Sequence, residues 1–186
     1  MARIEPIDPQ QAPDDVRTAL ENLPPLNIFR TLAHAETAFR PFLRFGGAVL
    51  GQMSLDPVVR ELAILTVAKE AEAEYEWIQH VAIARHLGAT DAQIDALEAG
   101  SDDAFDEPQA AAIAFAAAVV HSPHVSDDLF ERVRAQFSER EVIELLLAIG
   151  DYLMLARVMT VLQIEMDDAV GDAVLRGRRD RPADGA

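Results

Sequence analysis

The chain has 186 residues, a length that fits one domain able to bury a sizeable core. Half of the residues are hydrophobic and 26% are charged, the profile of a soluble globular protein rather than a disordered one. Its 16 basic and 32 acidic residues give a formal net charge of −16, so nucleic acids and anionic membranes are poor partners. The chain contains no cysteine, which excludes disulfides, thiolate nucleophiles and cysteine-bound metals.

Helix signals run through almost the whole chain and predict an all-α fold, because the alternation typical of strands is nearly absent. Asp56 before Pro57 and the capping box of Ser138 with Glu141 mark helix starts, and Gly88 marks an end. We expect helices near residues 13–22, 36–50, 56–71, 74–87, 91–98, 107–120, 126–136 and 138–166.

The two ends of the chain and its most apolar segment bear on where the protein works. Met1 to Gln11 lack the basic start and apolar stretch of a signal peptide, so we expect a cytoplasmic protein. Residues 145–164 approach the length of a membrane span, but polar residues such as Asp151 and Arg157 interrupt them, which favours a buried helix. We predict a single domain over residues 1–170 and a solvated polar tail over residues 171–186.

The segment Pro57 to Ala71 has apolar residues on every side of its helical wheel, which predicts a buried helix. Glu61 falls among these apolar positions, so its carboxylate is expected to lie out of water. A carboxylate in that position needs a partner or carries a raised pKa. One interpretation is a structural ion pair with Arg60 or Arg157, and the other is an acid that belongs to a functional site.

The next helix gathers Glu76, His80 and Ile83 in one sector of its wheel. Glu76 and His80 are four positions apart, so we expect the carboxylate to contact the imidazole. Such a pair suits a general acid or base at physiological pH. The alternative interpretation is a histidine whose hydrogen bonds are satisfied within the core.

Residues 60–90 read RELAILTVAKEAEAEYEWIQHVAIARHLGAT, and this segment resembles the carboxymuconolactone decarboxylase family, which includes the alkyl hydroperoxidase D type enzymes. The motif of the peroxidase branch is a glutamate, a cysteine twelve positions later, a second cysteine three further on and a histidine four further on. Glu61 and His80 match the acid and the histidine of this motif. Ala73 and Glu76 stand at the two cysteine positions, so the thiol peroxidase reaction is excluded.

Two further segments, Asn27 to Leu50 and Gly150 to Asp168, resemble a subgroup of the family that carries EYEWxxH, here EYEWIQH at residues 74–80. The resemblance implies a helical bundle of about seven or eight helices that assembles as a homo-oligomer, commonly a trimer or hexamer, with its site near a subunit interface. It also implies a small-molecule substrate and neither a metal nor an organic cofactor.

The resemblance assigns chemical roles to the matched residues. His80 is the candidate for proton transfer, Glu61 would orient it, and Glu76 would be an additional acid. The implied reaction is a decarboxylation, isomerisation or ring opening of a small lactone or carbonyl compound. A guanidinium can bind a substrate carboxylate through two hydrogen bonds, and aromatic side chains can line a pocket. The substrate-binding candidates are therefore Tyr75, Trp77 and Arg157.

Two other hypotheses stay open at this point. The first is a non-catalytic protein that binds a small molecule or an oligomeric partner and has lost the redox site. The second is a metal-dependent variant, in which Glu61, Glu76 and His80 are the ligands, since a Glu-x-x-x-His turn is compatible with zinc, manganese or iron. Because two carboxyls lie near one imidazole, Glu61 and Glu76 are expected to compete for the two N–H groups of His80, while one acid holds a proton at neutral pH.

Overall fold

The computed structural model describes residues 1–171, 173 and 175, and within these residues it contains helices and no strand. The all-α prediction is therefore confirmed over this part of the chain. The elements in chain order are the 3-10 turn η1 (Pro9–Gln11), α1 (Asp14–Glu21), α2 (Asn27–Leu32), α3 (Glu36–Gly51), α4 (Pro57–Glu70), α5 (Glu74–Leu87), α6 (Asp91–Ala99), α7 (Glu107–His121), α8 (Asp127–Gln136) and α9 (Glu139–Leu162).

Local capping chemistry explains why most helix ends fall where the sequence predicts them. The Asp56 side chain accepts hydrogen bonds from two backbone amides at the start of α4, and Ser138 forms its capping box with Glu141 at the start of α9. Gly88 ends α5 with a φ of 114°, a left-handed conformation that glycine adopts without a Cβ clash.

Helix α2 is absent from the sequence-based expectation, and its N-terminal hydrogen bond shows why. The helix has only six residues, and Leu26 at its N-cap provides no side-chain hydrogen bond. Instead, the backbone N–H of Asn27 donates to Oδ2 of Asp167 over 2.6 Å, from a residue 140 positions away. Because the capping group lies so far along the chain, the residues next to α2 contain no signal that predicts where this helix begins.

Helix α9 ends at Leu162, four residues before the predicted end at residue 166. Gln163 takes a left-handed conformation with a φ of 52°, which stops the helix. The chain then turns back, and Gln79 on α5 binds it through three hydrogen bonds: its amide nitrogen donates to the carbonyls of Asp167 and Asp168, and its oxygen accepts from Val170 N–H. We call residues 163–170 the strap. The predicted tail, residues 171–186, lies almost wholly outside the described residues.

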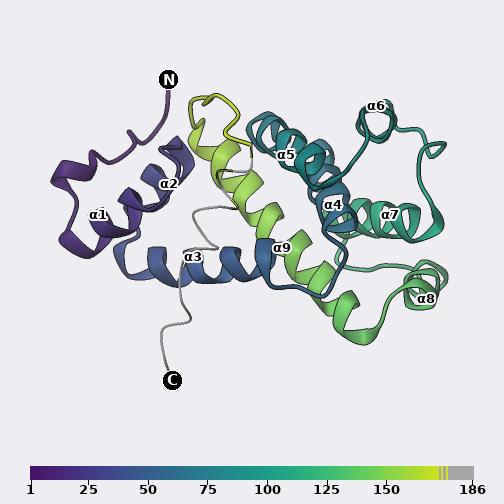
Figure 1. The fold of residues 1–186 in the computed structure, drawn as a ribbon. Helices are drawn as coiled ribbons and strands as arrows, with labels where there is room; N and C mark the ends of the chain where they lie inside the picture. Colours follow the sequence, from purple (N-terminus) through teal and green to yellow (C-terminus); the bar gives the residue numbers. More distant parts are fainter. Residues whose placement is uncertain (172, 174, 176–186) are drawn as a thin grey trace.

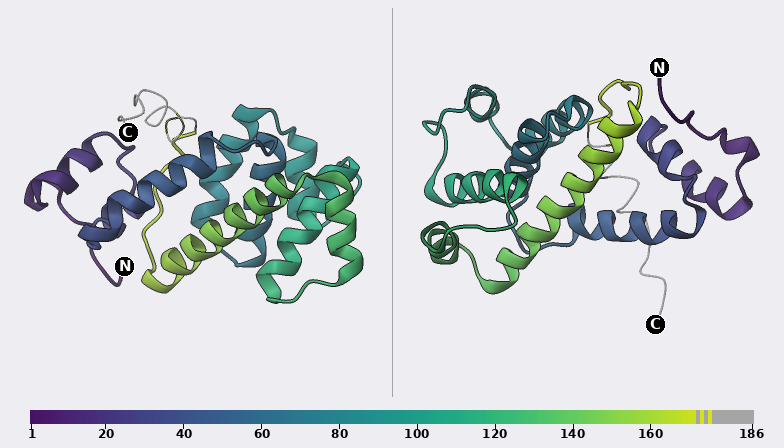
Figure 2. Two further views of the ribbon diagram at one scale, coloured as in Figure 1. Left: turned by 90° about the horizontal axis from the view of Figure 1, so that it is seen from below. Right: turned by 180° about the vertical axis from the view of Figure 1, so that it is seen from behind.

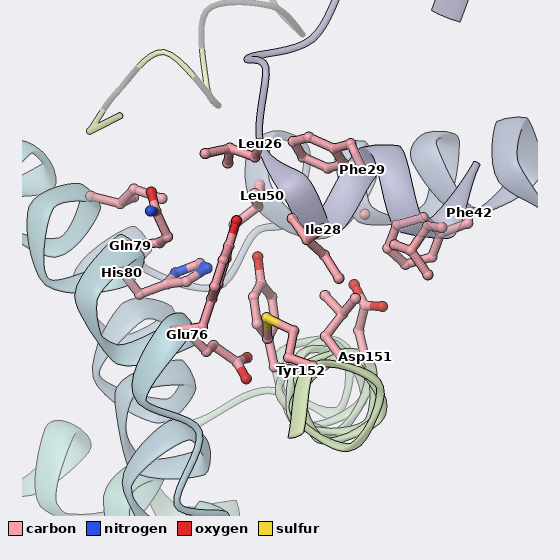
Figure 3. A pocket seen from close by; sticks show the side chains of 16 residues that line it. Leu26, Ile28, Phe29, Phe42, Leu50, Glu76, Gln79, His80, Asp151 and Tyr152 are labelled. Carbon is pink, nitrogen blue, oxygen red and sulfur yellow. The ribbon is translucent and has the colours of Figure 1, made fainter. Parts of the chain in front are cut away.

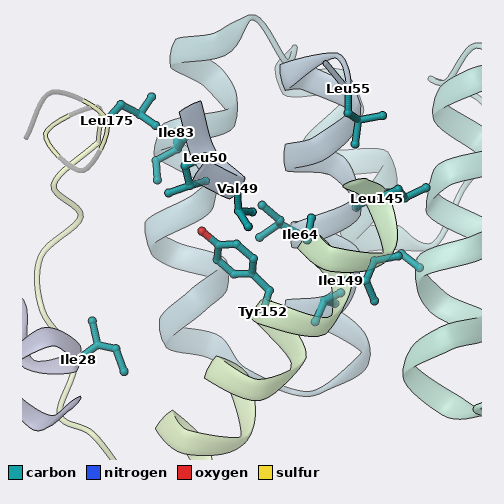
Figure 4. Packing of buried hydrophobic residues seen from close by; sticks show 14 of the residues in the cluster. Ile28, Val49, Leu50, Leu55, Ile64, Ile83, Leu145, Ile149, Tyr152 and Leu175 are labelled. Carbon is teal, nitrogen blue, oxygen red and sulfur yellow. The ribbon is translucent and has the colours of Figure 1, made fainter. Parts of the chain in front are cut away.

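Helix α4 lies at the centre of the molecule, between α5, α7 and α9 (Figure 1). Every residue from Val59 to Ala68 is buried, as its all-round apolar pattern predicts. Figure 4 shows Ile64 of α4 packed with Ile149 and Tyr152 of α9. Truncating a buried leucine or isoleucine in such a core to alanine costs about 2–5 kcal/mol of unfolding free energy. This tight packing holds the backbone of α4, and with it Glu61, in one position.

The remaining helices flank this centre on two sides. Figure 2 shows α1, α2 and α3 on one side of α9, with α6, α7 and α8 on the other. The N-terminal segment runs along the end of α9, where Arg3 N–H donates to the Leu162 carbonyl over 2.9 Å. Helices α2, α3, α5 and α9 therefore surround one region, and the candidate site lies there.

Helix α9 is long and apolar enough to cross a membrane by length and composition alone. In the structure it packs against α3, α4, α7 and α8, so it is a core helix. This agrees with the expectation of a buried helix over residues 145–164, although one side of α9 faces solvent. That side exposes 44–57% of each of its large apolar side chains, which are Ile143, Leu147, Met154 and Val161.

Candidate functional site

A small pocket opens between α2, α3, α5 and α9, and Figure 3 shows the side chains that line it. Its walls are mainly apolar, with a few polar groups that converge from α5 and α9. The polar groups belong to Tyr75, Glu76, Gln79, His80, Asp151 and Tyr152. An apolar pocket with a few convergent polar groups is the usual form of a small-molecule site.

A buried chain of three side chains, Arg60, Glu61 and His80, runs from α4 to the edge of this pocket. Arg60 donates from Nε and from a terminal nitrogen to Oε1 of Glu61, over 3.1 and 3.0 Å. The second oxygen of Glu61 lies 2.7 Å from Nδ1 of His80. Glu61 is fully buried, and Arg60 and His80 are 3% and 7% exposed. The ion pair with Arg60 that the sequence offered as one interpretation is present, and His80 is a second partner of the same carboxylate.

The imidazole of His80 points from α5 into the pocket (Figure 3). Because Glu61 accepts at Nδ1, that nitrogen carries the hydrogen, and Nε2 is the ring nitrogen left for other contacts. No residue within the described part of the chain forms a hydrogen bond with Nε2. Tyr152 of α9 meets the ring edge-on, with ring centroids 4.6 Å apart and planes at 83°. Glu61 and Tyr152 thus hold the ring in one orientation.

Glu76 lines the same pocket, but its carboxyl group has different surroundings. It is 2% exposed, and neither carboxyl oxygen has a hydrogen-bond partner among the described residues. The predicted competition between Glu61 and Glu76 for the imidazole is therefore wrong, since Glu61 alone binds it. Burial raises the pKa of the Glu76 carboxyl well above its ordinary value, and the nearby charge of Asp151 raises it further. This setting favours the protonated, neutral form.

Asp151, which interrupts an apolar run of the sequence, also lines the pocket. It is 4% exposed and lies on α9, next to Tyr152. Figure 3 shows Asp151 and Glu76 on two sides of the pocket, with Tyr152 between them. A signal was available in the sequence, since an acid within the buried stretch of an apolar helix demands a reason.

The three candidate substrate-binding residues occupy different places. Tyr75 lines the pocket, and its hydroxyl donates to Oδ2 of Asp167 in the strap over 2.5 Å. Burial, together with this hydrogen bond, raises the pKa of the Tyr75 hydroxyl. Trp77 points elsewhere and packs against the cluster that contains Leu65. Arg157 lies on the exposed side of α9, outside the pocket lining. The structure therefore brings only Tyr75 of the three to the pocket.

The ligand cluster required by the metal hypothesis does not form among the described residues. No group of three or more histidine, aspartate or glutamate side chains converges there on a common point. Glu61 uses its oxygens on Arg60 and His80, and Glu76 contacts neither through a hydrogen bond.

Comparisons with known proteins agree with this architecture. The model of the carboxymuconolactone decarboxylase family matches residues 36–119, whereas no curated protein sequence gives a significant match. An alkylhydroperoxidase AhpD core protein from Ralstonia eutropha is similar in structure, with a TM-score of 0.78 and 21% identity over 97% of this chain and 98% of its own. A peroxidase-related protein from Silicibacter has a TM-score of 0.73 and 18% identity, covering 84% of this chain and 87% of its own.

A cysteine-to-alanine variant of the debrominase Bmp8, solved in complex with 2,3,4-tribromopyrrole, is also similar. Its TM-score is 0.74 and its identity 20%, over 95% of this chain and 97% of its own. At these identities the likeness establishes a shared fold. The activities in the names of these neighbours belong to them.

Proposed function

Because the chain belongs to the carboxymuconolactone decarboxylase family through residues 36–119, we propose that its pocket is the active site of a cofactor-free acid–base enzyme. The substrate would be a small lactone or carbonyl compound that undergoes decarboxylation, isomerisation or ring opening. The observation that carries this proposal is the buried Arg60–Glu61–His80 chain, which ends at the pocket. Thiol chemistry is not available, because the chain has no cysteine.

In the proposed mechanism, Nε2 of His80 is the base. With Nδ1–H donated to Glu61, the neutral imidazole presents a lone pair at Nε2 and can take a proton from a carbon next to a carbonyl group. The imidazolium that forms is stabilised by Glu61, whose own charge is balanced by Arg60. Glu61 is thus a positioning residue, while His80 contacts the substrate.

Glu76 supplies the complementary acid in this mechanism. Its favoured protonated form can donate to the carbonyl oxygen of the substrate as His80 removes the proton from carbon. The proton on His80 then returns to a different atom of the substrate, and the enolic oxygen gives its proton back to Glu76. The two groups end the cycle in their starting states, so no cofactor is consumed.

Deuterium exchange tests this proposal without knowledge of the natural product. In D₂O, the protein should incorporate deuterium next to the carbonyl of small cyclic ketones and lactones, measured by proton NMR. His80→Ala and Glu61→Gln should each slow the exchange by about 10²-fold or more. His124→Ala, which removes an exposed histidine from a loop, is the matched control and should exchange at the wild-type rate.

Equal exchange by folded His80→Ala and by the wild type would contradict the enzymatic proposal. The second candidate function, a non-catalytic small-molecule-binding protein, is favoured by the small pocket and by a His80 ring whose one hydrogen bond within the described residues goes to Glu61. Binding of the same compounds without any exchange would support it.

We also propose that the protein works as a homo-oligomer, a trimer or hexamer by the family resemblance. The exposed side of α9 repeats apolar residues at intervals of four and seven, through Ile143, Leu147, Met154 and Val161, which is the spacing of a helix–helix seam. Light scattering at micromolar concentration should give a multiple of 20.3 kDa, and Leu147→Glu should lower it. A monomeric wild-type protein would contradict this proposal.

A further inference from the structure

The carboxyl group of Glu76 is the feature of the pocket that points most directly to a ligand. Its side chain is almost fully buried, and neither oxygen has a hydrogen-bond partner within the described part of the chain. Tyr75 and Gln79, which lie on the same helix and line the same pocket, both bind the strap. Because a buried polar group without a hydrogen bond is rare and destabilising, we expect a bound molecule to supply the partners that Glu76 lacks.

The protonation state of Glu76 determines which partners these are. Burial is the main cause that raises the pKa of this carboxyl above its ordinary value, and it favours the neutral form. A neutral carboxyl group presents an O–H donor on one oxygen and an acceptor on the other. A single ligand satisfies both oxygens if it carries an acceptor and a donor side by side, at the spacing of the two carboxyl oxygens.

A cis amide has this arrangement of donor and acceptor. Its C=O and N–H groups lie on the same edge, and bond lengths of about 1.23 and 1.33 Å place the oxygen and the nitrogen about 2.2 Å apart, close to the spacing within a carboxyl group. An open-chain secondary amide is trans, with the two groups on opposite sides. A small ring enforces the cis form, so a lactam or a cyclic imide can bind both oxygens of one carboxyl group.

We propose that the pocket binds a small lactam or cyclic imide, whose carbonyl oxygen accepts a hydrogen bond from Glu76 and whose N–H donates to the other Glu76 oxygen. This inference rests on the proposed function, because it makes the ligand the substrate of the proposed enzyme. When His80 has taken a proton from carbon and Glu76 has given its own to the carbonyl oxygen, Glu76 is a carboxylate. The ligand N–H stabilises that carboxylate, since hydrogen bonds to an ionised acceptor are about twice as strong as neutral ones.

The size of the pocket limits the ligand to one ring. The volume open to the centres of water molecules is about 70 Å³. At roughly 10–15 Å³ for each water, it holds about five waters, whose share of liquid volume is about 150 Å³. That is the size of a single five-membered or six-membered ring, whose carbon atoms would pack against apolar side chains such as Ile28, Phe29 and Leu50 (Figure 3).

Isothermal titration calorimetry at pH 7 with three five-membered rings tests the proposal. 2-Pyrrolidinone carries the carbonyl and the N–H, γ-butyrolactone has an oxygen in place of the N–H, and N-methyl-2-pyrrolidinone has a methyl group on that nitrogen. We expect 2-pyrrolidinone to bind about tenfold more tightly than either of the others, because the other two leave the acceptor oxygen of Glu76 buried and unpaired. Titration in two buffers of different ionisation enthalpy should show no net uptake or release of a proton, since Glu76 keeps its proton on binding.

Two substitutions of Glu76 test whether this residue is the one that recognises the amide. Glu76→Gln keeps a donor and an acceptor at the end of the side chain, so the preference for 2-pyrrolidinone over γ-butyrolactone should remain. Glu76→Met has neither group and should bind the two rings with affinities within about twofold of each other. Glu74→Met makes the same change at an exposed acid of α5, and this matched control should keep the wild-type preference.

Several results would overturn the inference. They are the absence of 2-pyrrolidinone binding, equal binding of 2-pyrrolidinone and γ-butyrolactone by the wild type, a preference that survives in Glu76→Met or is lost in folded Glu76→Gln, and the uptake or release of a proton on binding. If Glu76→Met does not fold, the preference in Glu76→Gln and the proton count decide. Deuterium exchange into cyclopentanone without a preference for the lactam would overturn this inference alone. A preference for the lactam without any deuterium exchange would overturn the enzymatic proposal alone.

Discussion

Glu61 on α4 and Glu76 on α5 are both buried beside one pocket, yet their carboxyl groups have opposite surroundings. Glu61 accepts hydrogen bonds from Arg60 and lies 2.7 Å from His80. Glu76 has no hydrogen-bond partner among the described residues, and its pKa is raised by burial. A carboxylate with charged partners is a fixed anion that orients its neighbours, whereas a buried carboxyl without a partner stores a proton and can offer it to a ligand. Burial alone therefore does not define the role of an acid in this site.

The largest effect on stability is expected from removing the partner of Glu61. Arg60→Leu would leave a buried carboxylate with His80 alone, and breaking a buried ion pair costs about 3–5 kcal/mol of unfolding free energy. Urea unfolding measures this loss. The matched control is Arg85→Leu in the exposed Arg85–Asp91 pair, for which a change within about 1 kcal/mol is expected. A loss in Arg60→Leu as small as in the control would show that Glu61 does not depend on Arg60.

Glu144 is a third buried glutamate, and like Glu61 it has hydrogen-bond partners. Burial by itself would raise its pKa, but hydrogen bonds from Arg140 and from the amides of Leu55 and Ser54 lower the pKa below its ordinary value. Its stabilising contribution is therefore present above pH 4.5 and is lost as the pH falls through the folded-state pKa. Glu144→Gln should cost about 1.5–3 kcal/mol at pH 7, the range for hydrogen bonds to charged groups, and less in acid. An equal cost in urea unfolding at pH 7 and at pH 3 would contradict this.

Glu76→Gln should give the smallest change in the free energy of unfolding at low pH. Its effect should depend on pH in the opposite direction to that of Glu144→Gln. Since the folded protein binds the Glu76 proton more tightly than the unfolded chain, the wild type loses stability as the pH rises above about 4.5 towards the folded-state pKa. The variant lacks this titration, so its advantage should grow with pH by at most about 1.4 kcal/mol per pH unit. Urea unfolding of both proteins between pH 5 and 8 measures the difference. A difference that stays constant over this range would show that Glu76 is ionised when folded.

The sequence predicts the helices whose ends are determined locally. Capping groups such as Asp56 and Ser138 lie next to the helices they start, so the expected α4 and α9 begin within one residue of the observed positions. Helix α2 could not be predicted in this way, because its first N–H is bound by Asp167. The early end of α9 lies at the left-handed Gln163, and the strap that follows is held by Gln79 through tertiary hydrogen bonds.

The site likewise combines features that neighbouring residues determine with features that depend on contacts between distant segments. A helical wheel shows that Glu61 and His80 face the interior, and the family motif pairs them, which the structure bears out with a hydrogen bond. The wheel does not show which element each residue meets. Two residues four positions apart need not bind each other: Glu61 of α4 binds Nδ1 of His80, whereas Glu76 has no hydrogen-bond partner among the described residues. The sequence pattern marks Asp151 as an acid within an apolar helix, but it does not show that Asp151 meets the residues of α5 at this pocket.

The strap also determines the order in which the pocket can be completed during synthesis. Its Asp167 binds both the first amide of α2 and the hydroxyl of Tyr75, two groups that leave the ribosome long before it. Since domains fold as their segments emerge, α4 and α5 can pack while the wall formed by α2 still lacks its anchor. Helix α9, which carries Asp151 and Tyr152, emerges only just before the strap. The nascent chain therefore holds the His80 side of the pocket well before it can enclose a ligand.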